Sequence, residues 1–255
     1  MAVRVAYPEG GEYSWTEALR PFSALGAVEV AFRSPQLFLN EVEIRDVVSP
    51  FSKLPVQAAT IHMAHAPITE PEIFARTLEK TVRIAKELEC PLIVVHPSRG
   101  RPPQVEEFFA QRIDPLLERA GALLCWETFE SKRRFLSGIE GIAAFCLCRG
   151  RGWHGACYDT SHLLKPQEEV LRDIQTYASV IKCFHLSNRA GGGGRGELEQ
   201  HLPLRHPEGE LDFEEVLRVI RESGFLGALT LEYLKEHHDR LVEDALWVEE
   251  QLKLR

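Results

Sequence analysis

The hydrophobic pattern of the chain alternates between short apolar runs typical of β-strands and longer amphipathic segments, from one end to the other. The apolar runs occupy residues 2–7, 27–32, 57–64, 91–97, 122–129, 155–161, 180–187 and 227–234. Short strands that are nearly continuous in apolar residues, each followed by a helix, describe a parallel sheet that is covered on its outside.

The segments between the runs have the periodicity of helices. In residues 71–89, apolar side chains such as Phe74, Leu78 and Val82 recur near the helical period. Further helices are expected to start at Val105, Gly138, Glu168, Asp212 and His238. Eight strand–helix units predict an α/β fold of the (β/α)8 TIM-barrel type, forming a single domain over residues 1–255. A doubly wound open sheet is the alternative, but no Gly-x-Gly-x-x-Gly follows the first run.

The composition describes an acidic protein that can bury a large core. Hydrophobic residues make up 44% of the chain and the net charge is −8, which gives no overall attraction to nucleic acid. The N-terminal segment becomes polar too early for a signal peptide, and no run of about 20 apolar residues is present to span a bilayer. We therefore expect a cytoplasmic protein without a membrane partner. The six cysteines lack paired Cys-x-x-Cys spacing, so reduced thiols are expected rather than disulfides or a zinc ribbon.

Ionisable residues stand near the C-terminal ends of the apolar runs, where a simple core would need aliphatic side chains throughout. They are His65, His96, Glu127, Asp159, His162, His185 and Glu232. Burying such side chains is costly unless they share a cation or a hydrogen-bond network. In a barrel, the C-terminal ends of the strands converge on one mouth. Carboxylates and imidazoles without thiolates suit Mn²⁺, Mg²⁺, Co²⁺ or Zn²⁺.

Several of these residues also have simpler interpretations. In the segment Cys157–Leu164, Asp159 could cap a turn and His162 could be a surface residue instead of a ligand. His65 and His96 could each be a hydrogen-bonded core histidine. Trp126 could stack on a sugar ring or pack inside the protein.

A second pair, Glu199 and His201, follows a glycine-rich segment at residues 190–196. The pair could supply further ligands, or a solvated acid and a histidine that contacts substrate. The glycine-rich segment could be a flexible surface loop or a lid over the barrel mouth. Cys125, Cys157 and Cys183 each precede a candidate ligand by two residues, so they are best explained as small side chains filling the barrel.

Short motifs follow one another at about the spacing of barrel units. They are His65-Ala66-Pro67, Val95-His96-Pro97, Glu127-Thr128, Asp159-Thr160-Ser161-His162, Phe184-His185-Leu186, His201-Leu202-Pro203 with Gly209 and Phe213 after it, and Leu231-Glu232. In their order and spacing they resemble the xylose-isomerase-like TIM-barrel superfamily. That superfamily includes sugar and sugar-phosphate isomerases and epimerases, and the endonuclease IV family of DNA repair enzymes.

Resemblance to the epimerase branch implies one divalent ion held by Glu127, Asp159, His185 and Glu232, with both glutamates exchanging protons with the substrate. The chemistry is reasonable, because an ion that bridges a carbonyl and the neighbouring hydroxyl acidifies the C–H bond between them and stabilises an enediolate. The candidate substrate-binding residues are His65, His162, His201, Trp126 and Arg195.

Resemblance to the endonuclease IV branch implies three zinc ions. These would use the same four positions and also His65, His96, His162, Glu199 and His201, with Glu199 where that family has Asp. The sequence departs from that branch at Ile68, where the family carries a DNA-inserting Tyr. It also lacks the glycine-rich continuation after Glu127-Thr128.

The segments that follow the strand ends are basic although the chain is acidic. Basic residues gather in residues 97–103 and 130–134, and the segment after the seventh run contributes Arg189, Arg195 and Arg205. Such a rim could serve solubility, or it could attract the phosphate of a sugar phosphate or of a DNA backbone.

The sequence therefore predicts a metal-dependent isomerase or epimerase that acts on a sugar or sugar phosphate. An endonuclease IV-like, zinc-dependent phosphodiesterase, with nucleic acid as its partner, is the alternative. A non-enzymatic barrel that has kept its metal is a third hypothesis. The sugar, the carbon acted on, the identity and number of metal ions, and the choice between a monomer and a homo-oligomer are left open.

Overall fold

Eight parallel strands close into a barrel, in the spatial order β1-β10-β7-β6-β5-β4-β3-β2. The computed structural model describes residues 1–8, 14–100, 104–131, 134–150, 152–191 and 199–253. The barrel strands are β1 (Ala2–Ala6), β2 (Ala27–Ala31), β3 (Gln57–His62), β4 (Leu92–Val95), β5 (Leu123–Glu127), β6 (His154–Asp159), β7 (Ile181–Leu186) and β10 (Ala228–Leu231). Each lies within or overlaps one of the apolar runs, so the predicted TIM barrel is confirmed.

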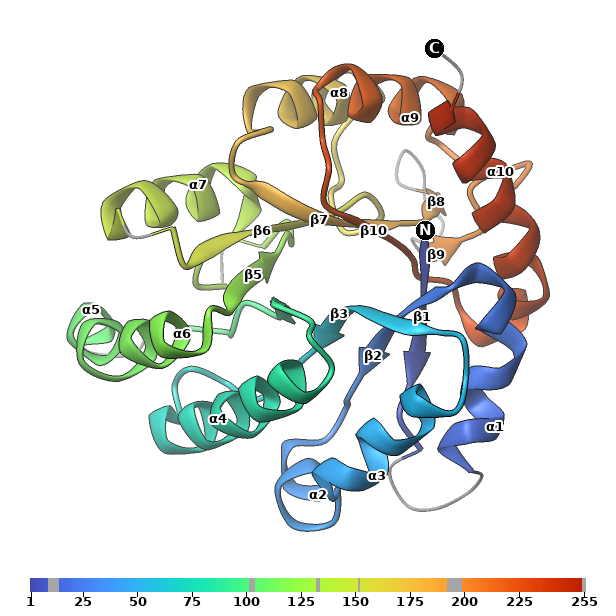
Figure 1. Ribbon diagram of the computed structural model, residues 1–255. Coiled ribbons are helices and arrows are strands. Elements are labelled where there is room, and N and C mark those ends of the chain that lie inside the picture. The colour runs from blue at the N-terminus through green and yellow to red at the C-terminus, as the bar shows by residue number, and fades with distance from the viewer. Residues whose placement is uncertain (9–13, 101–103, 132–133, 151, 192–198, 254–255) are drawn as a thin grey trace.

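Helices surround this barrel on its outer side (Figure 1). They are α1 (Trp15–Leu19), α2 (Pro35–Asn40), α3 (Ile44–Val48), α4 (Pro71–Glu87), α5 (Val105–Phe108), α6 (Asp114–Ala120), α7 (Gly138–Arg149), α8 (Gln167–Thr176), α9 (Phe213–Glu222) and α10 (Leu241–Lys253). Short 3-10 helices cover Arg20–Leu25, Ser49–Ser52 and Lys235–Arg240, and a π-helical turn covers Phe109–Ile113. None of the helices in the described residues has an apolar stretch that would reach across a bilayer.

The predicted helices agree with the structure except near the C-terminus. Asp212, expected at a helix start, caps α9 by accepting hydrogen bonds from the backbone N–H groups of Glu214 and Glu215. The start expected at His238 is wrong, because a 3-10 helix covers Lys235–Arg240 and α10 begins at Leu241. Helices α1 to α3 were not predicted, since elements of five or six residues are too short to develop a periodic pattern.

The two faces of the strands have different surroundings because successive side chains point to opposite sides. Trp126 on β5 points outward, where it is fully buried and its ring stacks on Phe74 of α4 at a centroid distance of 6.4 Å. Cys125, Cys157 and Cys183 instead form a separate buried cluster with Val94. Trp126 therefore packs between barrel and helices, and its interpretation as a sugar-stacking residue is wrong. The thiols fill the barrel, as expected, and none of the six cysteines forms a disulfide.

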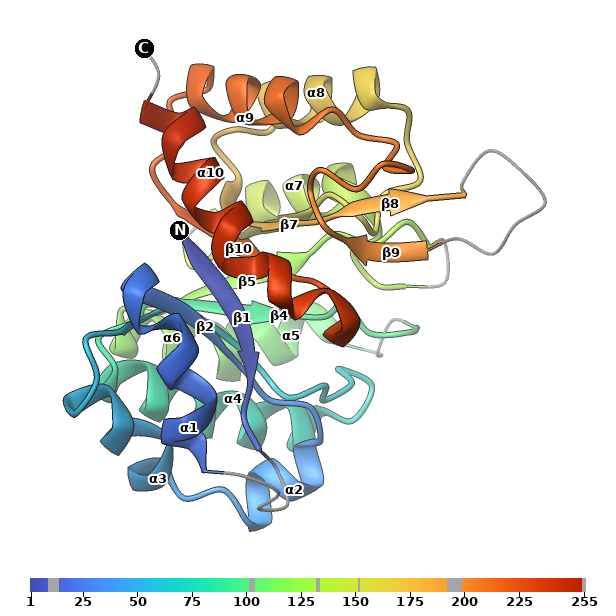
Figure 2. The same cartoon turned by 90° about the vertical axis from the view of Figure 1, so that its right-hand side faces the viewer.

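A short antiparallel hairpin of β8 (Asn188–Ala190) and β9 (Glu199–Leu202) extends beyond the barrel mouth (Figure 2). Residues 192–196 of the glycine-rich segment lie outside the described residues. Asn188 anchors the hairpin: its amide nitrogen donates to the carbonyls of Leu204 at 2.8 Å and Leu211 at 2.9 Å, and its oxygen accepts from the Leu211 N–H at 3.0 Å. A Cβ at Gly209 would fall 2.2 Å from the Asn188 amide nitrogen, so glycine is required there.

We expect Asn188→Ala to lower the free energy of unfolding by about 2–4 kcal/mol, because two buried carbonyls and the buried N–H groups of Leu211 and Arg189 lose their partner. Urea unfolding followed by circular dichroism would measure it. Asn40→Ala, at an exposed position of α2, is the matched control and should change the value by less than about 0.5 kcal/mol. Equal effects for the two variants would contradict the anchoring role.

Candidate metal centre

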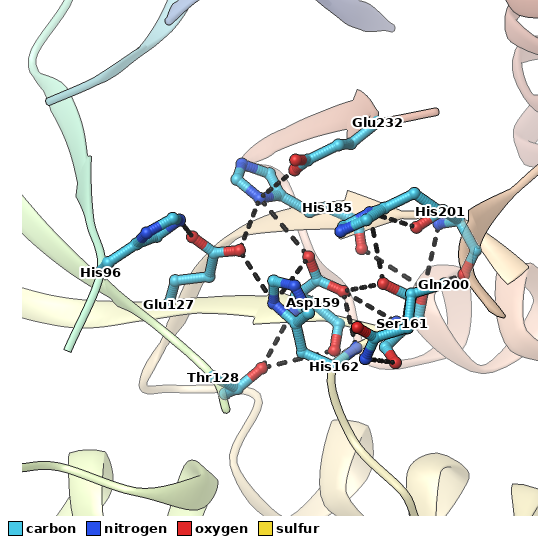
Figure 3. A network of polar contacts seen from close by, with 12 residues as sticks. His96, Glu127, Thr128, Asp159, Ser161, His162, His185, Gln200, His201 and Glu232 are labelled. Atoms are coloured by element: carbon cyan, nitrogen blue, oxygen red, sulfur yellow. Dashed lines mark hydrogen bonds and ion pairs between the residues drawn. The ribbon is translucent and has the colours of Figure 1, made fainter. Parts of the chain in front are cut away.

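Ionisable side chains from four barrel strands meet at the C-terminal mouth of the barrel (Figure 3). Glu127 and Asp159 are the last residues of β5 and β6, His185 lies near the end of β7, and Glu232 follows β10. One ligand atom from each of the four lies within 4.8 Å of the others. Strand register explains part of this proximity, because Asp159 pairs with His185 across β6 and β7.

Two further groups that could hold a cation adjoin this one. His62, His96 and Glu127 form the first, and Asp159, His162 and His201 form the second, again with ligand atoms within 4.8 Å of one another. Glu127 and Asp159 each belong to two groups. The mouth is therefore a continuous array of carboxylates and imidazoles.

Several atoms at the centre of this array are buried and form no hydrogen bond. They are Glu127 Oε1, Asp159 Oδ2, His162 Nδ1, His185 Nδ1 and Glu232 Oε2. His185 Nδ1 lies 3.0 Å from Glu232 Oε2 and 3.5 Å from Glu127 Oε1, and His162 Nδ1 lies 3.1 Å from Glu127 Oε1. Unpaired buried polar atoms are costly, and a divalent cation would satisfy all of these at once. The donor set of oxygen and imidazole nitrogen fits such an ion.

Asp159 shows how the local sequence aims a ligand atom. Its Oδ1 accepts hydrogen bonds from Ser161 N at 2.7 Å, Ser161 Oγ at 2.9 Å and His162 N at 3.0 Å. These bonds form because the chain turns directly after β6. They occupy one carboxylate oxygen fully and leave Oδ2 facing the array.

His201 is held at the array in a strained conformation. Its φ is 58°, which a residue with a side chain adopts at a cost of about 1–3 kcal/mol. Its Nδ1 lies 3.3 Å from both Ser161 Oγ and Ser187 Oγ, and the neighbouring Gln200 donates to the Ser161 carbonyl at 3.0 Å. These contacts connect β9 to the loop after β6.

A second layer of polar side chains lies inside the barrel next to His185. Glu29 Oε2 accepts hydrogen bonds from His185 Nε2 at 3.0 Å and from Thr60 Oγ1 at 2.7 Å. Arg4 forms an ion pair with Glu232, and its Nε lies 3.5 Å from Glu29 Oε1. Because Nε2 of His185 is bonded to Glu29, its Nδ1 is the nitrogen that faces the array.

Sequence reasoning missed Arg4, Glu29 and His62, all of which carry the same signal as the residues it found. Each is an ionisable residue within an apolar run. Arg4 and Glu29 stand in the middle of β1 and β2, away from the C-terminal strand ends, whereas His62 is the last residue of β3 and lies at such an end. His62 Nε2 lies 3.1 Å from Glu127 Oε2, beside His96 Nε2 at 2.8 Å from the same atom.

The remaining predicted site residues lie outside the central group. His65 is exposed, and its Nδ1 lies 3.3 Å from His96 Nδ1, so the structure brings His62 rather than His65 to Glu127. Glu199 is exposed on β9 and belongs to none of the three groups. Arg195 lies outside the described residues.

The charges of the array shift the pKa values of its members in opposite directions. Burial alone would raise the pKa of Glu127, but the histidines around it outweigh burial and hold that pKa well below its ordinary value. Burial alone would lower the pKa of His162, yet Asp159 and Glu127 raise it to about 9. For His185 the carboxylates again prevail, chiefly Glu29, and its pKa lies well above the ordinary value. Burial, assisted by Arg4 and His96, lowers the pKa of His62 to about 4.

Two pockets open beside the array. One of about 520 Å³ contains His162, and one of about 190 Å³ contains Glu232 and Arg4. A larger pocket of about 700 Å³ lies at the other end of the barrel, where Met1, Ala27 and Leu226 contribute to its lining. It contains none of the residues of the three groups, so we place the functional site at the mouth.

The family model of the xylose isomerase-like TIM barrel matches residues 36–254. The chain belongs to this family. A search of curated proteins finds no match.

Solved structures share the fold of this xylose isomerase-like chain. The apo form of the 3-keto-D-glucoside 4-epimerase YcjR from E. coli has a TM-score of 0.72 at 12% identity, covering 98% of this chain and 99% of that one. A xylose isomerase-like TIM barrel protein from Mycobacterium smegmatis in complex with magnesium has a TM-score of 0.74 at 15% identity, covering 99% and 96%. An AP endonuclease of family 2 from Brucella melitensis has a TM-score of 0.65 at 15% identity, covering 91% and 93%. At these identities the likeness concerns the fold.

We expect Glu29→Gln to weaken divalent-metal affinity about 10- to 100-fold, because the neutral amide no longer holds His185 in the tautomer with Nδ1 free. Isothermal titration of metal-free protein with Mn²⁺ or Zn²⁺ measures it. Glu118→Gln, exposed on α6, is the control and should bind the metal as the unmodified protein does.

Asp159→Asn removes the charge of a candidate ligand and should weaken metal affinity more than Glu29→Gln does. Unchanged affinity in Asp159→Asn would show that the array is not a metal site.

Metal binding should release protons at pH 7.5. The pKa of His162 is raised to about 9 and that of His185 lies well above its ordinary value, so both rings are protonated at pH 7.5 when no ion is bound. A ring nitrogen must lose its proton to coordinate a metal. Metal affinity should therefore rise as the pH increases towards 9. Titrations in buffers of different ionisation enthalpy would count the released protons, and a count of zero would contradict this charge state.

Proposed function

We propose that this xylose isomerase-like barrel is a divalent-metal-dependent isomerase or epimerase that acts on a sugar or sugar phosphate. The observation that carries the proposal is the convergence of unpaired buried atoms from Glu127, Asp159, His185 and Glu232 at one point of the barrel mouth. The E. coli epimerase and the magnesium-bound protein from M. smegmatis, which share the fold, support it.

The chemistry that a bound divalent cation supplies is the stabilisation of an enediolate, by polarising a substrate carbonyl and the hydroxyl beside it. The chain itself must then move a proton to and from the carbon between these groups. Glu127 and Glu232 are the candidates, because both are carboxylates of the central group. General acid–base catalysis of this kind contributes about 10²- to 10⁴-fold to the rate.

The two glutamates have different neighbours, which suggests different roles. Burial alone would raise the pKa of Glu232, but Arg4 and His185 hold it well below its ordinary value. Glu232 is thus kept ionised beside a permanent cation, and it lines a pocket that reaches the surface. Glu127 Oε2 instead lies 3.1 Å from His62 Nε2 and 2.8 Å from His96 Nε2 inside the buried array. We assign proton removal to Glu232. Glu127 is the second carboxylate on the proton-transfer path and would first take up, from substrate or solvent, the proton that it returns.

The adjoining groups favour a second candidate, an AP endonuclease-like zinc-dependent phosphodiesterase. Because Glu127 and Asp159 belong to two groups each, several cations could lie a few Å apart, as in metal-assisted phosphoryl chemistry. Ile68 argues against this candidate, since the residue at the expected DNA-inserting position is fully buried. The isomerase is therefore preferred.

The experiment combines metal analysis with solvent isotope exchange. We expect about one Mn²⁺, Mg²⁺ or Co²⁺ per chain, and incorporation of deuterium from D₂O at the carbon next to the carbonyl in a panel of sugars and sugar phosphates. Glu127→Gln and Glu232→Gln should each lower the exchange rate at least about 10²-fold, with Glu118→Gln as the control.

Two outcomes would contradict the proposal. The first is two to three tightly bound Zn²⁺ ions together with cleavage of duplex DNA at an abasic site that Glu127→Gln abolishes, which would establish the phosphodiesterase. The second is a bound metal without turnover of either substrate class, which would leave a non-enzymatic barrel.

A further inference from the structure

The loops after β4 and β5 bring two arginines to one pocket beside the metal centre. The backbones of Arg99 and Arg134 form a β-bridge, and the N–H of Phe135 donates to the Ser98 carbonyl at 2.9 Å. Both arginines line the pocket of about 520 Å³, together with Phe129, Glu130, Ser131, His162, Leu164 and Gln200. The pocket therefore joins the arginine pair to a member of the array.

The Arg134 side chain is held by a backbone carbonyl and an aromatic ring. Its Nη1 donates to the Pro97 carbonyl at 2.7 Å, and its guanidinium lies 4.1 Å from the centroid of the Phe129 ring. Since a guanidinium carries five N–H donors, most of them stay available for a ligand. The position of this cation is thus set before anything binds.

The two arginines, Arg99 and Arg134, have no ion-pair partner among the acidic side chains in the part of the chain that the structure describes. The neighbouring Glu130 uses its Oε2 to accept a hydrogen bond from Leu164 N at 2.7 Å. Burial and the nearby Arg99 both lower the pKa of Arg134. Two cations that repel each other in one pocket would be stabilised by an anion.

The pocket is close enough to the metal centre for one small molecule to reach both. The Phe129 ring, on which Arg134 lies, stacks on His162 at a centroid distance of 3.9 Å. His162 in turn lies 3.1 Å from Glu127 Oε1. An anionic group between the arginines would therefore sit at one end of a substrate whose other end lies at Glu127.

Two other arginines expected to form a basic rim, Arg189 and Arg205, bind acidic side chains of the protein instead. Arg189 is buried, donating to Glu210 at 3.1 Å and to the Thr160 carbonyl at 3.3 Å. Arg205 is bound to Asp244 and Glu243. The rim prediction is thus wrong for these two, which stabilise the fold. Arg99 and Arg134 are the arginines that line this pocket of about 520 Å³, and a pair of guanidinium groups in one pocket suits a single phosphate.

We propose that Arg99 and Arg134 form a subsite for the phosphate of a phosphomonoester, so that the substrate is a phosphorylated sugar. This inference rests on the proposed function for the identity of the rest of the substrate. The geometry favours a phosphate because its oxygens can accept bonds from two guanidinium groups at once.

The test is the binding of inorganic phosphate to the full chain, prepared metal-free by a chelator that is then removed by gel filtration. Arg99→Gln and Arg134→Gln should each raise the dissociation constant about 10-fold or more, because each removes a charge-assisted hydrogen-bonding group. Arg45→Gln removes the same charge from an exposed position on α3 and should leave the constant unchanged. Circular dichroism melts would verify that each variant is folded. If Arg134→Gln does not fold, Arg134→Lys would replace it in the test, because lysine keeps the charge but lacks the guanidinium group.

Three outcomes would overturn the subsite: no measurable phosphate binding, binding that both Gln variants leave unchanged, or an abasic-site duplex that binds more tightly than phosphate and loses its affinity in the same variants. Because the measurement uses no metal and no turnover, it is independent of the isomerase test. Arginine-dependent phosphate binding without sugar exchange would refute the proposed function alone. Exchange on neutral sugars without phosphate binding would refute the subsite alone.

Discussion

The need to balance buried negative charge at the barrel mouth determines how the rest of this structure is arranged. Glu29, Glu127 and Asp159 are fully buried around the ring of His185, and Glu232, with 16% of its side chain exposed, contacts the same ring. Arg4 is the permanent cation in contact with Glu29 and Glu232. One guanidinium does not balance four carboxylates, so further positive charge must come from protonated histidines or from a bound ion. The raised pKa values of His162 and His185 are the consequence when only protons are available.

The fold makes this concentration of charge tolerable by surrounding it with rigid and neutral structure. Parallel strands in register place the candidate ligands side by side, and Cys125, Cys157 and Cys183 each precede one of them by two residues on the same strand. Burial raises the pKa of the Cys157 thiol, so it stays uncharged. Turns after the strands then complete the orientation, as the bonds from Ser161 and His162 to Asp159 show. The barrel strands therefore set where these side chains lie, and the loops set how their polar atoms are oriented.

The mouth is electrostatically asymmetric, and this asymmetry suits a substrate with two different ends. On the side of β1 and β10, the charge of Arg4 is taken up by Glu232 and Glu29 within the protein. On the side of β4 and β5, Arg99 and Arg134 face a pocket without an acidic ion-pair partner among the described residues. Under the proposals made above, the cation matched inside the barrel lowers the pKa of Glu232, and the two arginines without an ion-pair partner bind the substrate's anionic group. The solved relatives share the barrel at 12–15% identity, so such loop residues are where members of one fold can differ.

The sequence by itself determined the barrel and most of the candidate ligands at its centre. Alternating apolar runs and amphipathic segments specify a closed parallel sheet, and an acidic or imidazole residue at a strand end stands out because burial there is costly. Glu127, Asp159, His185 and Glu232 are among the seven residues that stand out in this way. The resemblance to the epimerase branch selected these four, and the structure brings them together. Only the tertiary structure decided which neighbours surround them. His62 replaces His65 beside Glu127, and Arg4 and Glu29 lie beneath His185. Trp126 faces the helices, and Arg189 and Arg205 stabilise the fold. The physical reason is that periodicity fixes which face of a strand a residue occupies, whereas contacts across the barrel depend on strand register and loop path, which no local pattern encodes.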